Sequence, residues 1–241
     1  MGAAFDRGAT FDMRRDVLAM LWKEYAQFRR NKVNEVGLAV VVAVLFGVAP
    51  LLMQMKEPLP GNILSIVTFG ILFLSAFLAT TIMSEGVFGE EVKDGTLRML
   101  LTTGIRPAAI FVGKWLALMM RALAIVVIVA GLQRSLLAVM GNTAGGVDLR
   151  WTALGIGWGL LMSSYTAAAN AAVSLVARSL SEARLLGVIA TMLPALSLGG
   201  LAHLLGLGRG ALILLSIILF VLTVASFLLA FVAFRSEKTR A

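Results

Sequence analysis

The stretch Glu85–Lys114 reads EGVFGEEVKDGTLRMLLTTGIRPAAIFVGK, and it is the longest interior part of the chain that can face water. It is charged and interrupted by glycines, and it lies between two apolar runs at residues 62–84 and 107–132. Crossing a bilayer takes about 20 mostly apolar residues. We therefore interpret the stretch as a water-facing connection between two membrane spans.

The composition agrees with a membrane protein. Of 241 residues, 59% are hydrophobic and 14% are charged, and the mean hydropathy is +0.93. Soluble domains average about 45–50% apolar and about 25% charged residues. The length allows about six spans and leaves no large soluble domain. We expect an all-α membrane protein.

The expected spans are residues 36–55, 63–84, 108–132, 151–177, 185–205 and 211–234. A polar loop with turn-forming residues is predicted at 133–150. Pro194 and Gly199-Gly200 predict that the fifth span is interrupted, as a bent or re-entrant segment. We expect a single transmembrane domain, with a cytoplasmic and interfacial part at 1–34, the spans at 36–234 and a cytoplasmic tail at 235–241.

Lys and Arg residues gather at alternate ends of these spans. Most of them lie in the N-terminal segment, in residues 85–106, in the turn at 178–184 and in the tail. By the positive-inside rule, both termini and the Glu85–Arg106 segment are cytoplasmic in a multi-pass protein of the inner or plasma membrane. Topology and anionic lipid head groups also explain the net charge of +8, so we expect no nucleic-acid partner.

The N-terminal segment carries a basic amphipathic helix. Leu18, Leu21, Tyr25 and Phe28 recur at helical spacing and are surrounded by basic residues. We expect this helix to lie in the head-group plane, with these residues at the interface: Trp22, Lys23, Glu24, Tyr25 and Arg29. The alternative is an ordinary helix that packs on its own protein.

The central stretch predicts two short amphipathic pieces that meet at a break at Gly95-Thr96. Glu90, Glu91, Lys93 and Asp94 are expected to be exposed. A plain solvated loop is the alternative, but helix–helix connections are usually about 2–8 residues long. The greater length and the apolar periodicity favour a rigid cytoplasmic projection that transmits force to a partner.

Residues 90–114 resemble the cytoplasmic motif of type-2 ABC exporter permeases. In that family an acidic residue precedes Gly-Thr-Leu, a Leu-Leu pair, a short turn and a Gly-Lys pair that opens the third span. The matching residues are Glu91, Gly95, Thr96, Leu97, Leu100, Leu101, Thr102, Thr103, Gly113 and Lys114. The upstream WKEYAQFRR is similar to the interfacial helix of the family. Arg98 stands where Glu is usual, and Gly104 where Pro is usual.

The resemblance implies a permease subunit that pairs with a second copy or a paralogue and with two copies of an ABC ATP-binding subunit. It implies a coupling helix at about residues 85–101, with these residues contacting the ATPase: Glu85, Phe88, Glu90, Glu91, Lys93, Asp94, Gly95, Thr96, Leu97 and Arg98. The sequence has no G-x-x-x-x-G-K-[ST] loop for phosphates. We therefore expect ATP and Mg on the partner subunit, no cofactor on this chain, and no enzyme activity of its own.

Two cations are predicted inside the third span. Lys114 is near its cytoplasmic end and can reach the head groups by snorkelling. Arg121 lies about halfway across at ~1.5 Å of rise per residue. It either lines a translocation path or pairs with a carboxylate such as Glu85 or with helix-end carbonyls.

The fourth span is rich in small and polar residues. Gly155 and Gly159 form a small-xxx-small pair that permits close helix contact. Ser163, Ser164 and Asn170 either belong to this packing or line a polar path together with Arg121.

Other function classes fit less well. With no cysteine and a single histidine, we expect no metal site and no disulfide. Spans three to six contain no Asp or Glu, so a membrane-embedded enzyme would lack acid–base partners. A non-transporting sensor or immunity subunit bound to an ATPase remains an alternative. The transported substrate stays open among lipids, drugs, peptides, haem-related compounds and ions.

Overall fold

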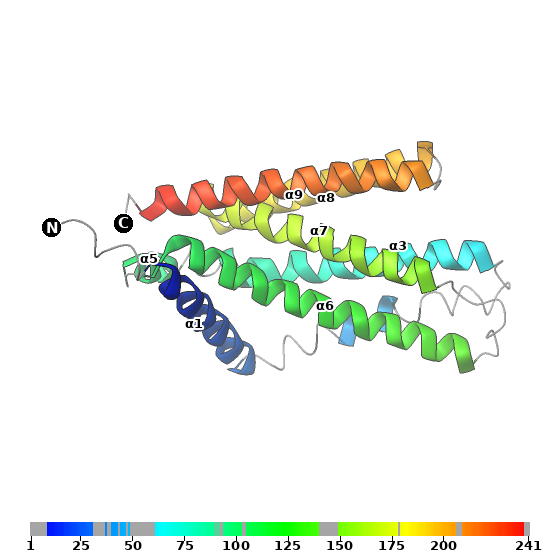
Figure 1. Cartoon of the computed structure of the whole chain (residues 1–241), viewed down its shortest axis with the longest axis horizontal. Helices are drawn as coiled ribbons and strands as arrows, with labels where there is room; N and C mark the ends of the chain where they lie inside the picture. The colour runs from blue at the N-terminus through cyan, green and yellow to red at the C-terminus, as the bar shows by residue number, and fades with distance from the viewer. Residues whose placement is uncertain are drawn as a thin grey trace. The chain divides into compact units, whose positions relative to one another are not determined.

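The computed structural model of the chain describes residues 9–30, 37, 40–42, 44–46, 48, 61–89, 91, 94–102, 105–139, 149–177, 179–205 and 209–238. Its elements are α1 (Ala9–Arg30), α3 (Gly61–Ser84), the π-helical η1 (Glu85–Gly89), α5 (Thr96–Thr102), α6 (Pro107–Val139), α7 (Leu149–Val176), α8 (Leu180–Leu205) and α9 (Arg209–Lys238). Among the described residues there is no strand (Figure 1), which confirms the all-α prediction.

Four stretches of the described helices are long and apolar enough to cross a membrane. They are Ile63–Gly89, Pro107–Val139, Leu149–Val176 and Gly210–Ser236, and they correspond to the predicted spans two, three, four and six. The predicted fifth span corresponds to α8, which is not among these four. The predicted first span, at 36–55, lies mostly outside the described residues. The count of six spans stays a prediction.

The polar loop predicted to begin at residue 133 is wrong in its first part. α6 continues as a helix to Val139. Gln133 is 1% exposed, and its side-chain amide donates a hydrogen bond to the carbonyl of Phe46 at 3.1 Å. The side-chain amide N–H of Gln133 thus has a partner inside the protein, so this polar residue does not need to end the helix.

The predicted interruption of the fifth span is also wrong. α8 runs without a break through Pro194. Proline has no N–H, so the carbonyl four residues earlier, that of Ala190, loses its usual helical donor. The hydroxyl of Tyr165 in α7 donates to this carbonyl at 2.6 Å. A neighbouring helix thus supplies the hydrogen bond that Pro194 removes.

The chain forms two compact units that are interleaved along the sequence. The first contains Met1–Arg30, Met83–Leu118 and Tyr165–Ala241, and the second contains Asn31–Ile82 and Met119–Ser164. In the first unit α8 and α9 run side by side (Figure 1), while α9 also contacts α5 and α8 also contacts η1. The predicted cytoplasmic stretch belongs to the same unit as α1 and the first third of α6.

The two units have different kinds of core. In the first unit Phe88, Phe111 and Phe234 are each at most 2% exposed, and their rings pack at centroid distances of 5.5–6.4 Å. In the second unit small residues bring α3 and α7 together. A Cβ on Gly159 would lie 2.8 Å from Cβ of Ala76. This close approach confirms the helix contact predicted from the glycine spacing.

Candidate functional site

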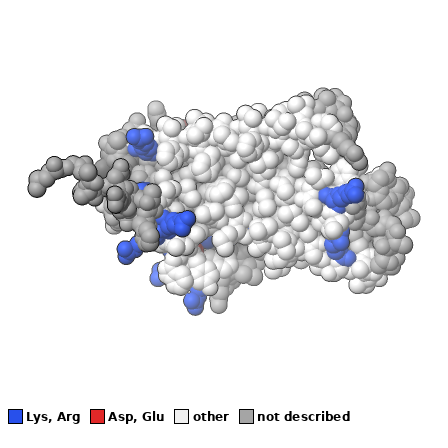
Figure 2. All heavy atoms as spheres, viewed as in Figure 1, with Lys and Arg blue, Asp and Glu red and all other residues white. Residues whose placement is uncertain are grey.

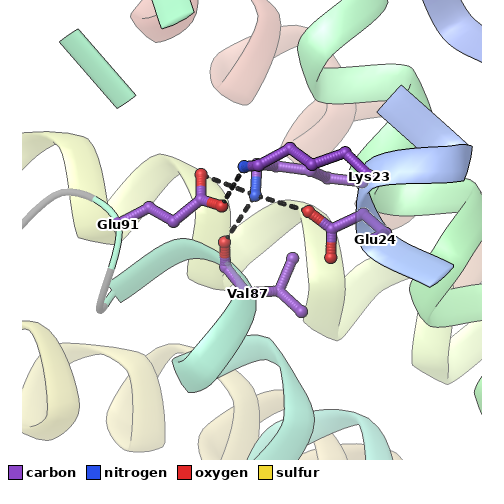
Figure 3. A network of polar contacts seen from close by, with 5 residues as sticks. Lys23, Glu24, Val87 and Glu91 are labelled. Atoms are coloured by element: carbon purple, nitrogen blue, oxygen red, sulfur yellow. Dashed lines mark hydrogen bonds and ion pairs between the residues drawn. The ribbon is translucent and has the colours of Figure 1, made fainter. Parts of the chain in front are cut away.

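Charged side chains from three parts of the chain meet in a buried group, which we name the charge cluster: Lys23 and Glu24 of α1, Glu91, and Lys114 of α6. The Nζ atom of Lys114 lies 2.9 Å from Oε1 of Glu24 and 2.7 Å from Oε2 of Glu91. The Nζ atom of Lys23 lies 2.5 Å from Oε1 of Glu91. In Figure 3 the carboxylates of Glu24 and Glu91 point toward these ammonium groups from different elements.

The charges of the cluster balance, with two cations and two carboxylates. Three acceptors surround Lys114, because the carbonyl of Val87 in η1 also accepts a hydrogen bond from it at 2.9 Å. They match the three N–H donors of an ammonium group. The Phe88 ring, whose centroid lies 5.8 Å from Nζ, adds a cation–π contact. Buried ion pairs need additional hydrogen bonds to offset desolvation. Lys114 donates hydrogen bonds to Glu24 and to the Val87 carbonyl, whereas Oε2 of Glu91 is held by the ion pair and accepts no hydrogen bond from the described residues.

The prediction that Lys114 snorkels toward the head groups is wrong. Its side chain is 0% exposed, and those of Glu24 and Glu91 are 2% and 7% exposed. The neighbouring Gly113 explains how α1 comes close enough. A Cβ on Gly113 would lie 2.5 Å from Cβ of Met20 and 3.4 Å from the carbonyl oxygen of Val17. Only glycine allows this approach, which brings Glu24 to Lys114.

The sequence reasoning missed the cluster as a unit, although a signal was present. A lysine inside a span requires an acidic partner or a route to water. Spans three to six contain no Asp or Glu. The partners of Lys114 therefore had to come from the cytoplasmic segments. Glu24 and Glu91 lie in the two segments that carry the family resemblance.

The segment between α3 and α6 is anchored on one side and exposed on the other. Phe88 and Leu97 are buried at 2% and 3% exposure, and Val87 is also buried. Gly95 has φ of 70°, a conformation that favours glycine. α5 begins at the next residue, so the predicted break at Gly95-Thr96 is confirmed.

The predicted exposure of this segment holds only in part. Glu91 is 6% exposed, so the expectation that it faces water is wrong, because both lysines of the charge cluster bind it. Asp94 is exposed, and Gly95 and Thr96 are partly buried. The exposed face of α5 includes Met99, at 69% exposure. The side chains of Glu85, Glu90, Lys93 and Arg98 lie outside the described residues. The ATPase-contacting role of all these residues stays a prediction.

The polar residues of α7 are used in packing. Ser163 donates a hydrogen bond to the carbonyl of Ala76 at 3.1 Å, and the side-chain amide of Asn170 donates to the hydroxyl of Ser84 at 2.5 Å. Ser164 is 9% exposed. Arg121 is partly buried on α6 and interacts with another group. These contacts favour the packing interpretation, and the translocation path stays a prediction.

The outer face of α1 has an interfacial character. Trp22 and Tyr25 are 68% and 50% exposed, their ring centroids lie 5.7 Å apart, and Arg29 is exposed. Lys23 and Glu24 point the other way, into the charge cluster (Figure 3). One face of this helix therefore packs on the protein while the other exposes aromatic and basic side chains, and its position in the head-group plane stays a prediction.

Basic residues dominate the visible charged surface. On the face drawn in Figure 2, Lys and Arg side chains are visible among the described residues, and no Asp or Glu side chain is. The burial of Glu24 and Glu91 in the charge cluster contributes to this imbalance. Among the described residues there is also no group of His, Cys, Asp and Glu side chains that could hold a metal ion.

A comparison with known families assigns the chain. A family profile described as "ABC-2 family transporter protein" matches residues 20–198. The match begins within α1, includes the whole charge cluster and ends within α8. No curated protein and no solved structure matches the chain significantly. Because the profile covers well over half of the chain, the protein belongs to the ABC-2 family of transporter proteins.

Proposed function

We propose that this chain is the permease subunit of an ATP-driven exporter. The chain is a single permease domain with six spans, and it forms a dimer with a second copy or a paralogue. The dimer lies in the inner or plasma membrane, and both termini of each chain are in the cytoplasm. Two separate ATP-binding subunits hold ATP and Mg. The cargo belongs to the classes of lipids, drugs, peptides, haem-related compounds or ions. The family assignment as a membrane component of an ABC system supports this proposal.

The charge cluster is the observation that carries the proposal. It joins the segment between α3 and α6 to α1 through Lys23 and to α6 through Lys114. A segment held in this way moves together with both helices rather than as a loose loop. A force applied to it by a partner reaches α6 directly, because Glu91 and the Val87 carbonyl both bind Lys114.

The burial pattern refines which residues meet the ATPase. Glu91, Phe88 and Leu97 face the interior, so we assign them to anchoring the segment. The docking surface is then the exposed side of the α5 region, with Asp94, Met99 and Thr102. A protruding apolar side chain such as Met99 suits a hydrophobic pocket on a partner, where interface energy concentrates.

Two other functions give different outcomes in one experiment. A sensor or immunity subunit binds an ATPase without moving cargo, and a membrane-embedded enzyme binds none. The test is co-purification of this chain with an ABC ATP-binding subunit from the same cell, followed by ATP-dependent uptake of candidate cargo into inverted vesicles. We expect a stable complex and ATP-dependent uptake.

The docking surface is tested by Met99→Glu, which places a charge on the exposed side of α5. We expect it to reduce co-purification of the ATP-binding subunit by about tenfold or more, since loss of a central contact costs on the order of 2 kcal/mol. Val139→Glu is the matched control, because Val139 is 84% exposed at the other end of α6. Wild-type retention of the ATPase by Met99→Glu would show that α5 is not the docking surface.

A further inference from the structure

A groove lies between α1 and the beginning of α6. It has a volume of about 610 Å³ and is lined by Met13, Arg14, Val17, Leu18, Leu21, Arg106 and Leu116. Five of these side chains are apolar, and the other two are arginines. The volume lies in the range of about 300–1,000 Å³ that is usual for small-molecule sites.

The two arginines differ from the lysines of the charge cluster. Within the part of the chain that the structure describes, neither Arg14 nor Arg106 forms an ion pair, whereas Lys23 and Lys114 are both paired with carboxylates. Arg14 is exposed and Arg106 is partly buried. A guanidinium group offers several N–H donors in a planar arrangement that matches phosphate oxygens. The surface that lines the groove is almost entirely apolar, so the two arginines line it with their hydrocarbon stems, and their guanidinium groups would meet an anion at its edge.

The apolar walls indicate what kind of anion fits. Leu18 is 64% exposed and Met13 is 38% exposed, so the groove leaves apolar surface uncovered beside its two cations. A soluble phosphate would satisfy the arginines and leave this surface in water. An amphiphile with a phosphate head and a hydrocarbon tail would cover both parts. We propose that the groove binds an anionic phospholipid, with the phosphate at Arg14 and Arg106 and an acyl chain along Leu21 and Leu116.

The neighbouring surface of α1 favours a lipid from the membrane. Trp22 and Tyr25 are exposed one and two turns after Leu18 and continue its outward face. Aromatic side chains of this kind sit at the level of lipid head groups. The cytoplasmic leaflet carries anionic lipids that attract basic segments next to a membrane. A lipid in this groove would therefore place its head group beside the basic and aromatic side chains of α1.

This inference does not depend on the ATP-binding subunit. It concerns a lipid held between α1 and α6, and it can be tested on the purified full-length chain alone. The test is native mass spectrometry of the protein in detergent, titrated with phosphatidylglycerol, with phosphatidylcholine of the same chain length, or with glycerol 3-phosphate. We expect saturable binding of one phosphatidylglycerol, weaker binding of phosphatidylcholine, and no binding of glycerol 3-phosphate in the same concentration range.

The variant Arg14→Gln/Arg106→Gln should weaken phosphatidylglycerol binding on the order of 30-fold, from the usual contribution of a basic residue near an anionic lipid surface. Arg29→Gln/Arg30→Gln is the control, because it removes the same number of charges, from the end of α1 that does not line the groove. We expect it to retain most of the affinity. If both variants lost the same affinity for phosphatidylglycerol, general charge attraction would explain the binding and the proposal would be overturned.

Leu116→Trp gives an independent test, since it fills the groove and keeps both arginines. We expect it to abolish binding of the long-chain lipid. Unchanged phosphatidylglycerol binding by this variant, or binding of glycerol 3-phosphate as tight as that of the lipid, would also contradict an anionic lipid site.

Discussion

The ammonium group of Lys114 in α6 binds α1, Glu91 and η1, the parts of the chain on which the proposed mechanism depends. It is fully buried, and its partners are Glu24 of α1, Glu91, and the Val87 carbonyl of η1. Removing one member of a buried ion pair leaves an uncompensated charge, which costs far more than the pair contributes. The stability of this region therefore depends on the balance of charges more than on any one contact.

Lys114→Met should lower the free energy of unfolding by about 3–5 kcal/mol, because it leaves Glu24 without its lysine in a buried site. Denaturant titration of the protein in detergent measures this change. Lys114→Met/Glu24→Gln should recover part of the loss, since Glu91 keeps its ion pair with Lys23. Lys23→Met is the control and should cost less, because the Lys23 side chain is 33% exposed. A Lys114→Met protein as stable as wild type would show that the cluster is not formed.

For single residues, the sequence identified the members of the charge cluster more reliably than it predicted the direction of their side chains. The resemblance marked Gly113, Lys114 and Glu91, and the glycine at position 95 was correctly taken as a break. It could not reveal that Lys114 is buried, because snorkelling and internal pairing produce the same pattern along one helix. The choice between them depends on α1, which is 90 residues away along the chain.

Among the helices, α7 and α8 show how the fold accommodates a proline. The Tyr165 hydroxyl of α7 supplies the hydrogen bond that Pro194 cannot donate to Ala190. On the same pair of helices, a Cβ on Gly187 would lie 2.8 Å from Oδ1 of Asn170, so α8 approaches α7 closely there. These contacts hold α8 beside α7 without interrupting either helix.

Tyr165→Phe should reduce the free energy of unfolding by about 1–3 kcal/mol, the cost of leaving a buried carbonyl without a donor. In a Pro194→Ala background the restored N–H can bind this carbonyl, so the same substitution should cost much less. Denaturant titrations of the four proteins in this cycle measure the difference. Equal costs in the two backgrounds would show that the Tyr165 hydroxyl does not compensate for the proline.

Sequence periodicity predicted where the helices begin, but it was less successful in predicting whether a helix continues past a polar residue or a proline. The predicted spans two, four and six begin within two residues of α3, α7 and α9. The errors were at Gln133, whose side chain donates to the distant Phe46 carbonyl, and at Pro194, where the Tyr165 hydroxyl donates to the Ala190 carbonyl. Such long-range hydrogen bonds leave no trace in the local pattern of apolar residues, so a polar residue or a proline was mistaken for an end or a break.

For the molecule as a whole, the two units share helices, and these helices would carry the proposed coupling. The first unit contains α1, the segment between α3 and α6, and the first third of α6, which are the elements that the charge cluster joins. α3, α6 and α7 each contribute residues to both units. Movement of the α5 region by an ATP-binding subunit would therefore act on helices that continue into the second unit.

The most direct test of this account measures whether the charge cluster holds the α5 region to α1. The chain has no cysteine, so spin labels can be attached at Ala19→Cys and Met99→Cys, both exposed, and their separation measured by electron–electron double resonance. The comparison is with the same labels in the charge-neutral variant Lys23→Met/Glu24→Gln/Glu91→Gln/Lys114→Met. We predict a single narrow distance distribution with the native cluster and a broad one without it, whereas equally narrow distributions would contradict the proposed link.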